Sequence, residues 1–314
     1  MRGTDNKAKL KHVIEAKQFS ERKMLQEIFS KADDMAAKDA KGKLPQSLKG
    51  KRVASFFYEE STRTRFSFEA AILALGGKVV STEKASQFSS VAKGETLTDT
   101  IKILNCYVHA IIMRHNIKGS AKIASETSKV PVINAGDGQG EHPTQALLDI
   151  YTIQKEIGRI DNLSIAMIGD LRYGRTVHSL VYLLESCKGV KIYFVSPKSL
   201  RMPEEYLKGL KDAGIQFEET EDLNKVLDKV DILYVTRIQK ERFENPEEYE
   251  KVKGYYTVNK ETLKKIKKDA IIMHPLPRVT EIDPEIDDDP RAAYFRQARN
   301  GLYIRMALLD IILG

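Results

Sequence analysis

The sequence of 314 residues is 42% hydrophobic and 30% charged, which is typical of a folded globular protein and excludes a fibrous or disordered one. Its formal net charge is +7, but the basic residues are scattered, mostly lysine and not interleaved with aromatic residues, so the charge alone does not indicate nucleic-acid binding. The segment Met1–Phe19 is polar, and no apolar run approaches the ~18 residues that a membrane helix needs, so neither secretion nor a membrane span is expected.

Only two cysteines occur, Cys106 and Cys187, and neither has a cysteine or histidine partner at metal-ligand spacing. We therefore expect a cytoplasmic protein with no disulfide framework, metal site or cofactor. The sequence also lacks a recognisable Ser-His-Asp arrangement and a pair of catalytic carboxylates.

The first half of the chain alternates helical patterns with apolar runs of strand length. Apolar residues repeat at helical spacing in Ser20–Met35, and again from about Arg63 to Leu75, where two glycines end the pattern. The runs that predict strands are Arg52–Tyr58, Ala110–Met113 and Val130–Asn134.

The second half continues the alternation and ends in a predicted amphipathic helix, Ala292–Leu313. Its predicted strands are Leu163–Ile168, Val190–Val195, Asp231–Thr236 and Ala270–Met273. Strands alternating with helices predict parallel sheets, and the length suits two lobes. We expect an α/β fold of two doubly wound parallel-sheet lobes with helices on both faces, divided near the glycine-rich stretch Gly136–Pro143.

The strongest motif is Ser61-Thr62-Arg63-Thr64-Arg65, which follows a predicted strand and begins a predicted helix. The first turn of a helix presents unpaired backbone N–H groups and a partial positive charge, and both favour a phosphate. The hydroxyl groups add donors, and Arg63 can bind an oxyanion through two parallel hydrogen bonds. A simple helix cap with solvent-exposed arginines is the alternative, but two Thr-Arg pairs at this junction favour a phosphate site.

Two more polar motifs follow predicted strands. Arg114 ends a strand, and ligands of parallel sheets bind beyond such carboxyl ends, although a single arginine is weak evidence. The segment Asn134–Gln145 leads into a predicted helix start that contains His142 and Gln145. His142 can stabilise negative charge on a carbonyl oxygen, but a capping or buried histidine fits the sequence equally well.

Three polar strand ends occur in the second half. Gly169–Thr176 is similar to the start of a dinucleotide site but lacks the Gly-x-Gly-x-x-Gly spacing. Its arginines favour an anion, so we interpret Arg175 as a carboxylate ligand, with a surface arginine as the alternative. Thr236–Gln239 and His274–Arg278 complete the set, and the backbone carbonyls of the latter can accept hydrogen bonds from a substrate.

Arginine is concentrated in these segments. Lysines outnumber arginines 34 to 17 in the whole chain, yet the motifs contain seven arginines: Arg63, Arg65, Arg114, Arg172, Arg175, Arg237 and Arg278. Because the arginine side chain matches planar carboxylates and phosphates, this bias predicts a site for several oxyanions.

In this order the motifs resemble the aspartate/ornithine carbamoyltransferase family, specifically its aspartate branch, over essentially the whole chain. The Ser-Thr-Arg-Thr-Arg segment is typical of the family. Glu60 and Arg172 are mild departures from its pattern. The segments that indicate the aspartate branch are Asn134–Asp137, His142–Gln145, Gly169–Thr176, Arg237–Gln239 and His274–Arg278.

The resemblance implies two domains and a set of site residues. Residues 1–142, completed by a C-terminal helix of residues 296–314, would bind carbamoyl phosphate, and residues 143–295 would bind aspartate. The expected carbamoyl phosphate ligands are Ser61, Thr62, Arg63, Thr64, Arg114, His142 and Gln145. Arg175, Arg237 and Gln239 would hold aspartate, and the backbone of Pro275 and Leu276 would line the site beside a cis Leu276–Pro277 bond.

The resemblance also implies a homotrimer with shared active sites. The segment Lys84–Gly94 is expected to be a loop that supplies Ser89 and Lys93 to a neighbouring chain. Whether regulatory chains join the trimer stays open.

The implied reaction transfers the carbamoyl group of carbamoyl phosphate to the α-amine of L-aspartate, an early step of pyrimidine biosynthesis. The residues expected to act in catalysis are Arg63, Thr64, Lys93, Arg114 and His142. Two alternatives remain: a carbamoyltransferase with another acceptor amine, such as ornithine, and a basic binding protein without enzymatic activity.

Overall fold

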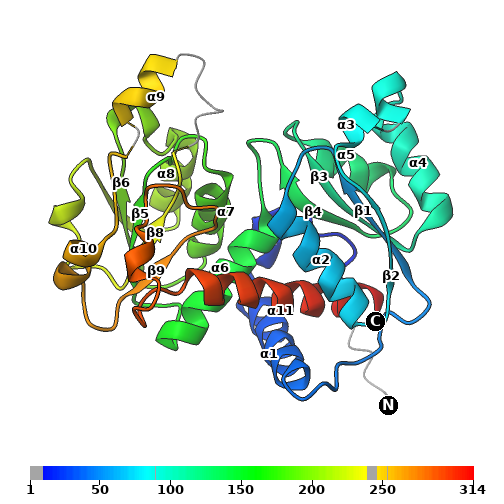
Figure 1. Cartoon of the computed structure of the whole chain (residues 1–314), viewed down its shortest axis with the longest axis horizontal. Coiled ribbons are helices and arrows are strands. Elements are labelled where there is room, and N and C mark those ends of the chain that lie inside the picture. The colour runs from blue at the N-terminus through cyan, green and yellow to red at the C-terminus, as the bar shows by residue number, and fades with distance from the viewer. Residues whose placement is uncertain (1–9, 89, 239–245, 253) are drawn as a thin grey trace. The chain divides into compact units, whose positions relative to one another are not determined.

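The computed structural model describes residues 10–88, 90–238, 246–252 and 254–314 (Figure 1). They form two compact units. The first unit contains residues 10–18, 26–144 and 302–314 of those described, and the second contains residues 19–25 and 145–301. Among the residues that the structure describes, no helix combines the length and the hydrophobicity that a membrane span needs.

A parallel sheet forms the centre of the first unit, in which the described strands have the order β2-β1-β3-β4. The elements of this part of the chain are α1 (Arg22–Asp39), β1 (Arg52–Phe57), α2 (Thr62–Ala74), β2 (Lys78–Thr82), α3 (Ala85–Phe88), α4 (Leu97–Tyr107), β3 (Ala110–His115), α5 (Ser120–Thr127) and β4 (Val132–Asp137).

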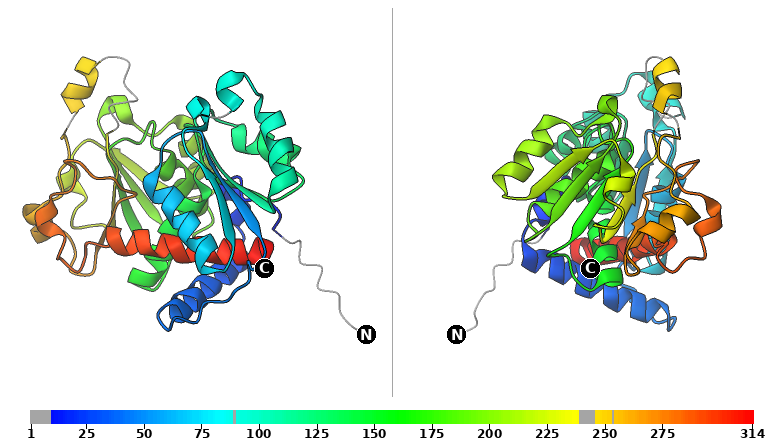
Figure 2. Two further views of the ribbon diagram at one scale, coloured as in Figure 1. Left: turned by 45° about the vertical axis from the view of Figure 1, so that its right-hand side comes forward. Right: turned by 90° about the vertical axis from the view of Figure 1, so that its left-hand side faces the viewer.

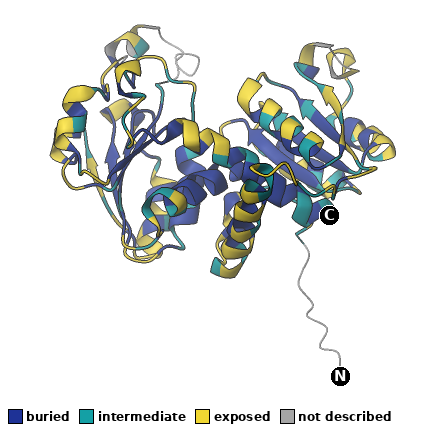
Figure 3. Cartoon of the chain, turned by 60° about the horizontal axis from the view of Figure 1, so that its bottom comes forward, coloured by how far each residue is buried: buried dark blue, intermediate teal, exposed yellow. Residues whose placement is uncertain are grey.

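Helices cover both faces of this sheet. Ala54 of β1 belongs to a buried cluster with Leu104 of α4 and Ala124 of α5. The next residue, Ser55, points to the opposite face and donates a hydrogen bond to Glu69 of α2 (2.9 Å). The strands β1, β3 and β4 are therefore largely buried, while the outer faces of the helices are exposed, as Figure 3 shows.

A second parallel sheet forms the centre of the other unit, with the order β7-β6-β5-β8-β9 among the described strands. Figure 2 shows its strands side by side. The elements of this part of the chain are α6 (Pro143–Ile157), β5 (Ser164–Ile168), α7 (Arg175–Leu184), β6 (Lys191–Val195), α8 (Glu204–Asp212), β7 (Gln216–Thr220), β8 (Ile232–Val235), α9 (Pro246–Val252), α10 (Lys260–Lys265), β9 (Ile271–Met273) and α11 (Tyr294–Leu313). The last turns of α11, from residue 302 onward, belong to the first unit.

This sheet is also covered on both faces. Leu233 of β8 packs in a buried cluster with Leu227 and Ile266. Its neighbour Tyr234 points the other way, and its hydroxyl donates a hydrogen bond to Asp149 of α6 (2.7 Å). The prediction of two doubly wound parallel-sheet lobes is confirmed.

Two strands were not predicted, β2 and β7, and each lies at an edge of its sheet. Both have mostly exposed or half-buried side chains, so they lack the apolar runs that revealed the seven predicted strands. The segment Lys84–Gly94 also differs from the prediction. It contains α3 and a 3-10 turn, Ser90–Lys93, where the sequence predicted a loop.

Gly169, at the end of β5, provides a test of how closely the strand ends pack. Its φ is +110°, and a Cβ there would lie 2.4 Å from the carbonyl oxygen of Thr236. Gly158 also has a positive φ (+82°) but has open space around it. We expect Gly169→Ala to lower the free energy of unfolding by about 3 kcal/mol and Gly158→Ala by about 1 kcal/mol. Urea unfolding of both variants checks this, and equal losses would contradict the close contact.

Candidate active site

The β1–α2 junction places the predicted phosphate motif at a helix start. Ser61 immediately precedes α2, and among the described residues its side chain makes no capping hydrogen bond. Thr62 and Arg63 in the first turn are exposed, and Thr64 is buried. The exposed side chains of Thr62 and Arg63 therefore lie at a helix start, a combination that suits an anion.

Arg65 has a different role from the one that the arginine count suggested. Its guanidinium forms ion pairs with Glu83 (3.1 Å) and Glu69 (3.7 Å). Arg278 likewise forms a two-pronged pair with Asp287. Arg65 and Arg278 therefore neutralise carboxylates of the protein itself, and their partners Glu83 and Asp287 could not be inferred from sequence spacing.

Arg114 lies at the carboxyl end of β3, where Phe57 of β1 is its partner in the sheet. Nη2 pairs with Oε1 of Glu59 at 2.8 Å, and Nη1 lies 3.4 Å from the carbonyl oxygen of Ala135. Glu59 was not predicted as a site residue. It follows β1 directly, so the strand-end argument that found Arg114 could have found it too.

His142 precedes α6 and is buried, next to Glu141. Glu141 accepts a hydrogen bond from the backbone N–H of Ala16 (2.6 Å). Burial is the main reason that the pKa of Glu141 rises from its usual 4.5 to about 7. A carboxyl group that titrates near neutrality therefore lies beside the predicted carbamoyl-binding histidine.

Lys93 ends the 3-10 turn Ser90–Lys93 in the first unit and is exposed. Exposure suits a side chain that acts on a neighbouring chain, although it also suits a solvated surface lysine. Ser89, its predicted partner, lies outside the described residues.

In the second unit, Arg175 is the first residue of α7, after Gly174. Asp170 is fully buried beneath this turn and accepts a hydrogen bond from the N–H of Tyr173 (2.9 Å). The N–H of Asp170 in turn donates to the hydroxyl of Thr236 (3.0 Å). The ends of β5 and β8 are thus fastened together, which places Arg175 and the end of β8 in one region of the unit.

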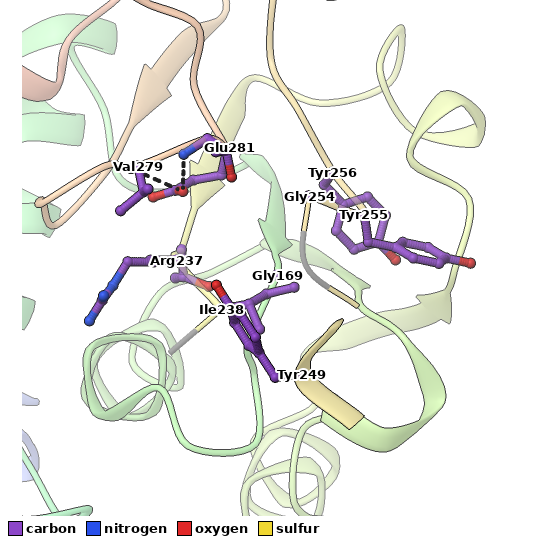
Figure 4. A pocket seen from close by; sticks show the side chains of 11 residues that line it. Gly169, Arg237, Ile238, Tyr249, Gly254, Tyr255, Tyr256, Val279 and Glu281 are labelled. Atoms are coloured by element: carbon purple, nitrogen blue, oxygen red, sulfur yellow. Dashed lines mark hydrogen bonds between the residues drawn. The ribbon is translucent and has the colours of Figure 1, made fainter. Parts of the chain in front are cut away.

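Arg237 lines a pocket of about 310 Å³ in the second unit. Figure 4 shows its guanidinium pointing away from Tyr255 and Tyr256, which line the other side of that pocket. Gln239, the third predicted aspartate ligand, lies outside the described residues.

The turn after β9 contains Pro275 and Leu276, which are both half-buried. The expected cis Leu276–Pro277 peptide bond is confirmed. Leu276 also has a positive φ of +54°.

Asp149 was not predicted from the sequence, yet it organises one side of the second unit. Its Oδ1 accepts hydrogen bonds from Gln145 (2.8 Å) and Gln297 (2.6 Å), and Oδ2 accepts one from the hydroxyl of Tyr234 (2.7 Å). Burial, together with Asp149, raises the pKa of Tyr234. Asp149 lies one helical turn after Gln145, so its spacing was the available signal for this contact.

No group of three or more His, Cys, Asp or Glu residues is arranged to hold a metal ion in the described part of the chain. The residues described above offer hydrogen bonding and charge: arginine and helix N–H donors in one unit, arginines and backbone groups in the other.

The raised pKa of Glu141 makes a pH-dependent prediction. Because the folded state holds this proton more tightly than the unfolded chain, its stabilising contribution is complete below about pH 4.5 and is lost as pH rises through about 7. Glu141→Gln should remove this part of the pH dependence, on the order of 3 kcal/mol. The free energy of unfolding measured from pH 5 to 8 checks it, with exposed Glu126→Gln as the control that keeps the wild-type slope. Parallel curves for Glu141→Gln and wild type would contradict the prediction.

Comparison with known proteins identifies both halves of the chain. Residues 11–155 match the carbamoyl-P binding domain of the aspartate/ornithine carbamoyltransferases, and residues 161–312 match their Asp/Orn binding domain. The chain is 54% identical over 308 residues to the chloroplastic aspartate carbamoyltransferase of Arabidopsis thaliana, covering 98% of this chain and 79% of that protein.

Solved structures agree with these matches. The catalytic subunit of M. jannaschii aspartate transcarbamoylase has 51% identity and a TM-score of 0.89, covering 96% of this chain and 98% of that one. The Trypanosoma cruzi enzyme in complex with carbamoyl phosphate and aspartate has 40% identity and a TM-score of 0.91, covering 97% of each chain. The parallel sheets, the strand-end arginines and these matches together show that the chain belongs to the aspartate/ornithine carbamoyltransferase family.

Proposed function

We propose that the chain is an aspartate carbamoyltransferase, which transfers the carbamoyl group of carbamoyl phosphate to the α-amine of L-aspartate. The products are N-carbamoyl-L-aspartate and phosphate, and the reaction serves de novo pyrimidine biosynthesis. The observation that carries this proposal is the 51–54% identity, over nearly the whole chain, to proteins named as aspartate carbamoyltransferases.

Carbamoyl phosphate is bound by a domain of residues 1–142 with residues 296–314. Its phosphate accepts hydrogen bonds from the N–H groups and hydroxyls at the start of α2 and from Arg114. The contact between Arg114 and Glu59 supports this role because it holds the guanidinium at the strand end. His142 and Gln145 face the carbamoyl group.

Aspartate is bound by residues 143–295. Arg175 and Arg237 each take one carboxylate, with Gln239 beside them. The arginines follow β5 and β8, neighbouring strands of one sheet, so both carboxylates of one aspartate can be met at one edge. Ornithine has only one carboxylate and leaves one arginine without its partner.

In the proposed reaction the neutral amine of aspartate attacks the carbamoyl carbon, and the bond to the phosphate oxygen then breaks. The intermediate oxyanion receives hydrogen bonds from His142, Arg114 and Thr64, and the leaving phosphate takes the proton of the amine. Preorganised donors of this kind lower the barrier mainly through electrostatics and orientation.

We further propose that the active protein is a cytoplasmic homotrimer in which Ser89 and Lys93 of one chain complete the site of its neighbour. The exposure of Lys93 supports this arrangement. A regulatory chain is a further partner to be sought by co-purification.

The acceptor specificity follows from the two arginines. Aspartate should be carbamoylated and ornithine hardly at all. Arg237→Ala should raise the KM for aspartate about 10- to 100-fold and leave that for carbamoyl phosphate nearly unchanged, because one charged hydrogen-bonding partner is lost. Steady-state kinetics with both amines checks this. Ornithine reacting as fast as aspartate would contradict the choice of acceptor.

The two arginines of the phosphate motif should behave differently. Arg63→Ala removes a preorganised donor and should lower kcat by about 10²–10³. Arg65→Ala breaks ion pairs with Glu69 and Glu83 and should keep most of its turnover while losing thermal stability. Measuring kcat and melting temperature for both variants separates the roles, and an Arg63→Ala variant with more than half the native activity would exclude Arg63.

A shared site predicts complementation between inactive chains. Lys93→Ala and Arg63→Ala should each be inactive alone. When they are mixed, dissociated and reassembled, some interfaces combine an intact Arg63 with an intact Lys93, so part of the activity returns. Mixed trimers that form, as shown by native mass spectrometry, but stay inactive would exclude the shared site. Each variant reassembled with itself is the control.

A further inference from the structure

His274 follows β9 and has both ring nitrogens engaged inside the second unit. Its side chain is only 1% exposed. Nδ1 accepts a hydrogen bond from the N–H of Leu276 (2.7 Å), and Nε2 lies 2.8 Å from Oε1 of Glu281. Because a backbone N–H can only donate, Nδ1 carries no proton. The ring is therefore the neutral tautomer whose Nε2–H donates to Glu281.

Glu281 links the imidazole of His274 to the backbone of Val279 and Thr280. Its Oε2 accepts hydrogen bonds from the N–H groups of Val279 (3.2 Å) and Thr280 (3.1 Å), drawn as dashed lines in Figure 4. Burial opposes ionisation, but the hydrogen bonds from His274 and the backbone outweigh it, and the pKa of Glu281 is lowered. The carboxylate is therefore charged and holds the ring orientation.

Leu276, the residue that the imidazole holds, has a backbone conformation that needs support. Its φ of +54° lies in the left-handed region, which residues other than glycine seldom occupy. Such conformations persist only where the surroundings fix them. On the other side of the turn, the N–H of His274 donates to Oε1 of Gln297 (2.8 Å), and Gln297 is held in turn by Asp149.

We propose that His274 is a positioning residue for carbamoyl transfer: its imidazole, oriented by Glu281, holds the Leu276 N–H and so fixes the Pro275–Leu276 backbone against the reacting group. This inference rests on the proposed function, which places that backbone at the substrate. His274 itself is buried with both ring nitrogens engaged, so it acts through Leu276 and not on the substrate.

Two substitutions separate the two contacts of the ring. His274→Asn puts a carbonyl oxygen close to the position of Nδ1, so it can still accept from the N–H two residues later but no longer reaches Glu281. His274→Gln places its amide near the position of Nε2, so it can still donate to Glu281 but leaves the Leu276 N–H without its acceptor. Both variants lose one of the two contacts.

A matched control comes from His109, whose Nδ1 also accepts a backbone hydrogen bond, from Arg52 (3.0 Å). His109 lies just before β3, at the amino ends of the strands and away from the edge that carries the predicted ligands. His109→Gln should therefore keep the native kcat while losing a contact of the same kind.

The experiment measures kcat, both KM values, binding of inorganic phosphate and melting temperature for each variant. Exchange of the Leu276 amide is followed by NMR with 15N-labelled leucine. His274→Gln should lower kcat about 100-fold, leave phosphate binding unchanged and make the Leu276 amide exchange faster. His274→Asn should retain kcat within about threefold and keep the amide protected, because it preserves the contact that the proposal makes decisive.

Any of three results would overturn the inference: native kcat in His274→Gln, native exchange of the Leu276 amide in His274→Gln, or losses of kcat in both variants that simply follow their melting temperatures. A failure of the proposed function looks different, since the wild-type chain would then form no carbamoyl aspartate, and the positioning role for this reaction would fail with it. If neither variant folds, the exchange of the Leu276 amide is measured in Glu281→Gln. This variant loses the carboxylate that orients the imidazole of His274, so the Leu276 amide should exchange faster. An unchanged exchange rate would contradict the inference.

Discussion

In each sheet the described strands run in one direction, and this places all their carboxyl ends at one edge of their unit. The helices that follow begin at the same edge, so their unpaired N–H groups are presented there as well. In the first unit this geometry collects the start of α2 and Arg114. In the second it collects Arg175, Arg237 and the turn that contains Leu276. Within each unit, residues far apart in sequence thus come to lie at one edge of the sheet. The direction of the strands therefore determines where the hydrogen-bond donors lie in each unit.

The donors at these edges are held in place by carboxylates of the protein itself. Glu59 pairs with Arg114, Asp149 holds Gln145, and Glu281 orients His274. A buried carboxylate is costly unless its oxygens are satisfied, and Asp149 and Glu281 each accept three hydrogen bonds from groups that need fixed directions. These carboxylates therefore orient the donors, and the hydrogen bonds that they accept offset the energetic cost of burying them.

Most of the architecture could be predicted from the sequence because apolar runs of strand length alternate with helical periodicity. All seven predicted strands are present. Strands β2 and β7 were not predicted, because their edge positions leave their side chains exposed and their patterns polar. The phosphate motif could be predicted because a helix start has recognisable local chemistry. Partners brought together only by folding could not be predicted. Glu83 takes Arg65 out of the predicted oxyanion site, and Gln297 reaches Asp149 from 148 positions away.

We propose that one edge of each unit binds one part of the substrates, phosphate in the first unit and aspartate in the second. A crystal structure of the chain with both products, phosphate and N-carbamoyl-L-aspartate, tests it most directly. Phosphate should lie against the backbone of Ser61–Thr64 and Arg114, and the two carboxylates of carbamoyl aspartate should lie against Arg175 and Arg237. Carboxylates bound away from Arg175 and Arg237, or phosphate bound away from the start of α2, would contradict it.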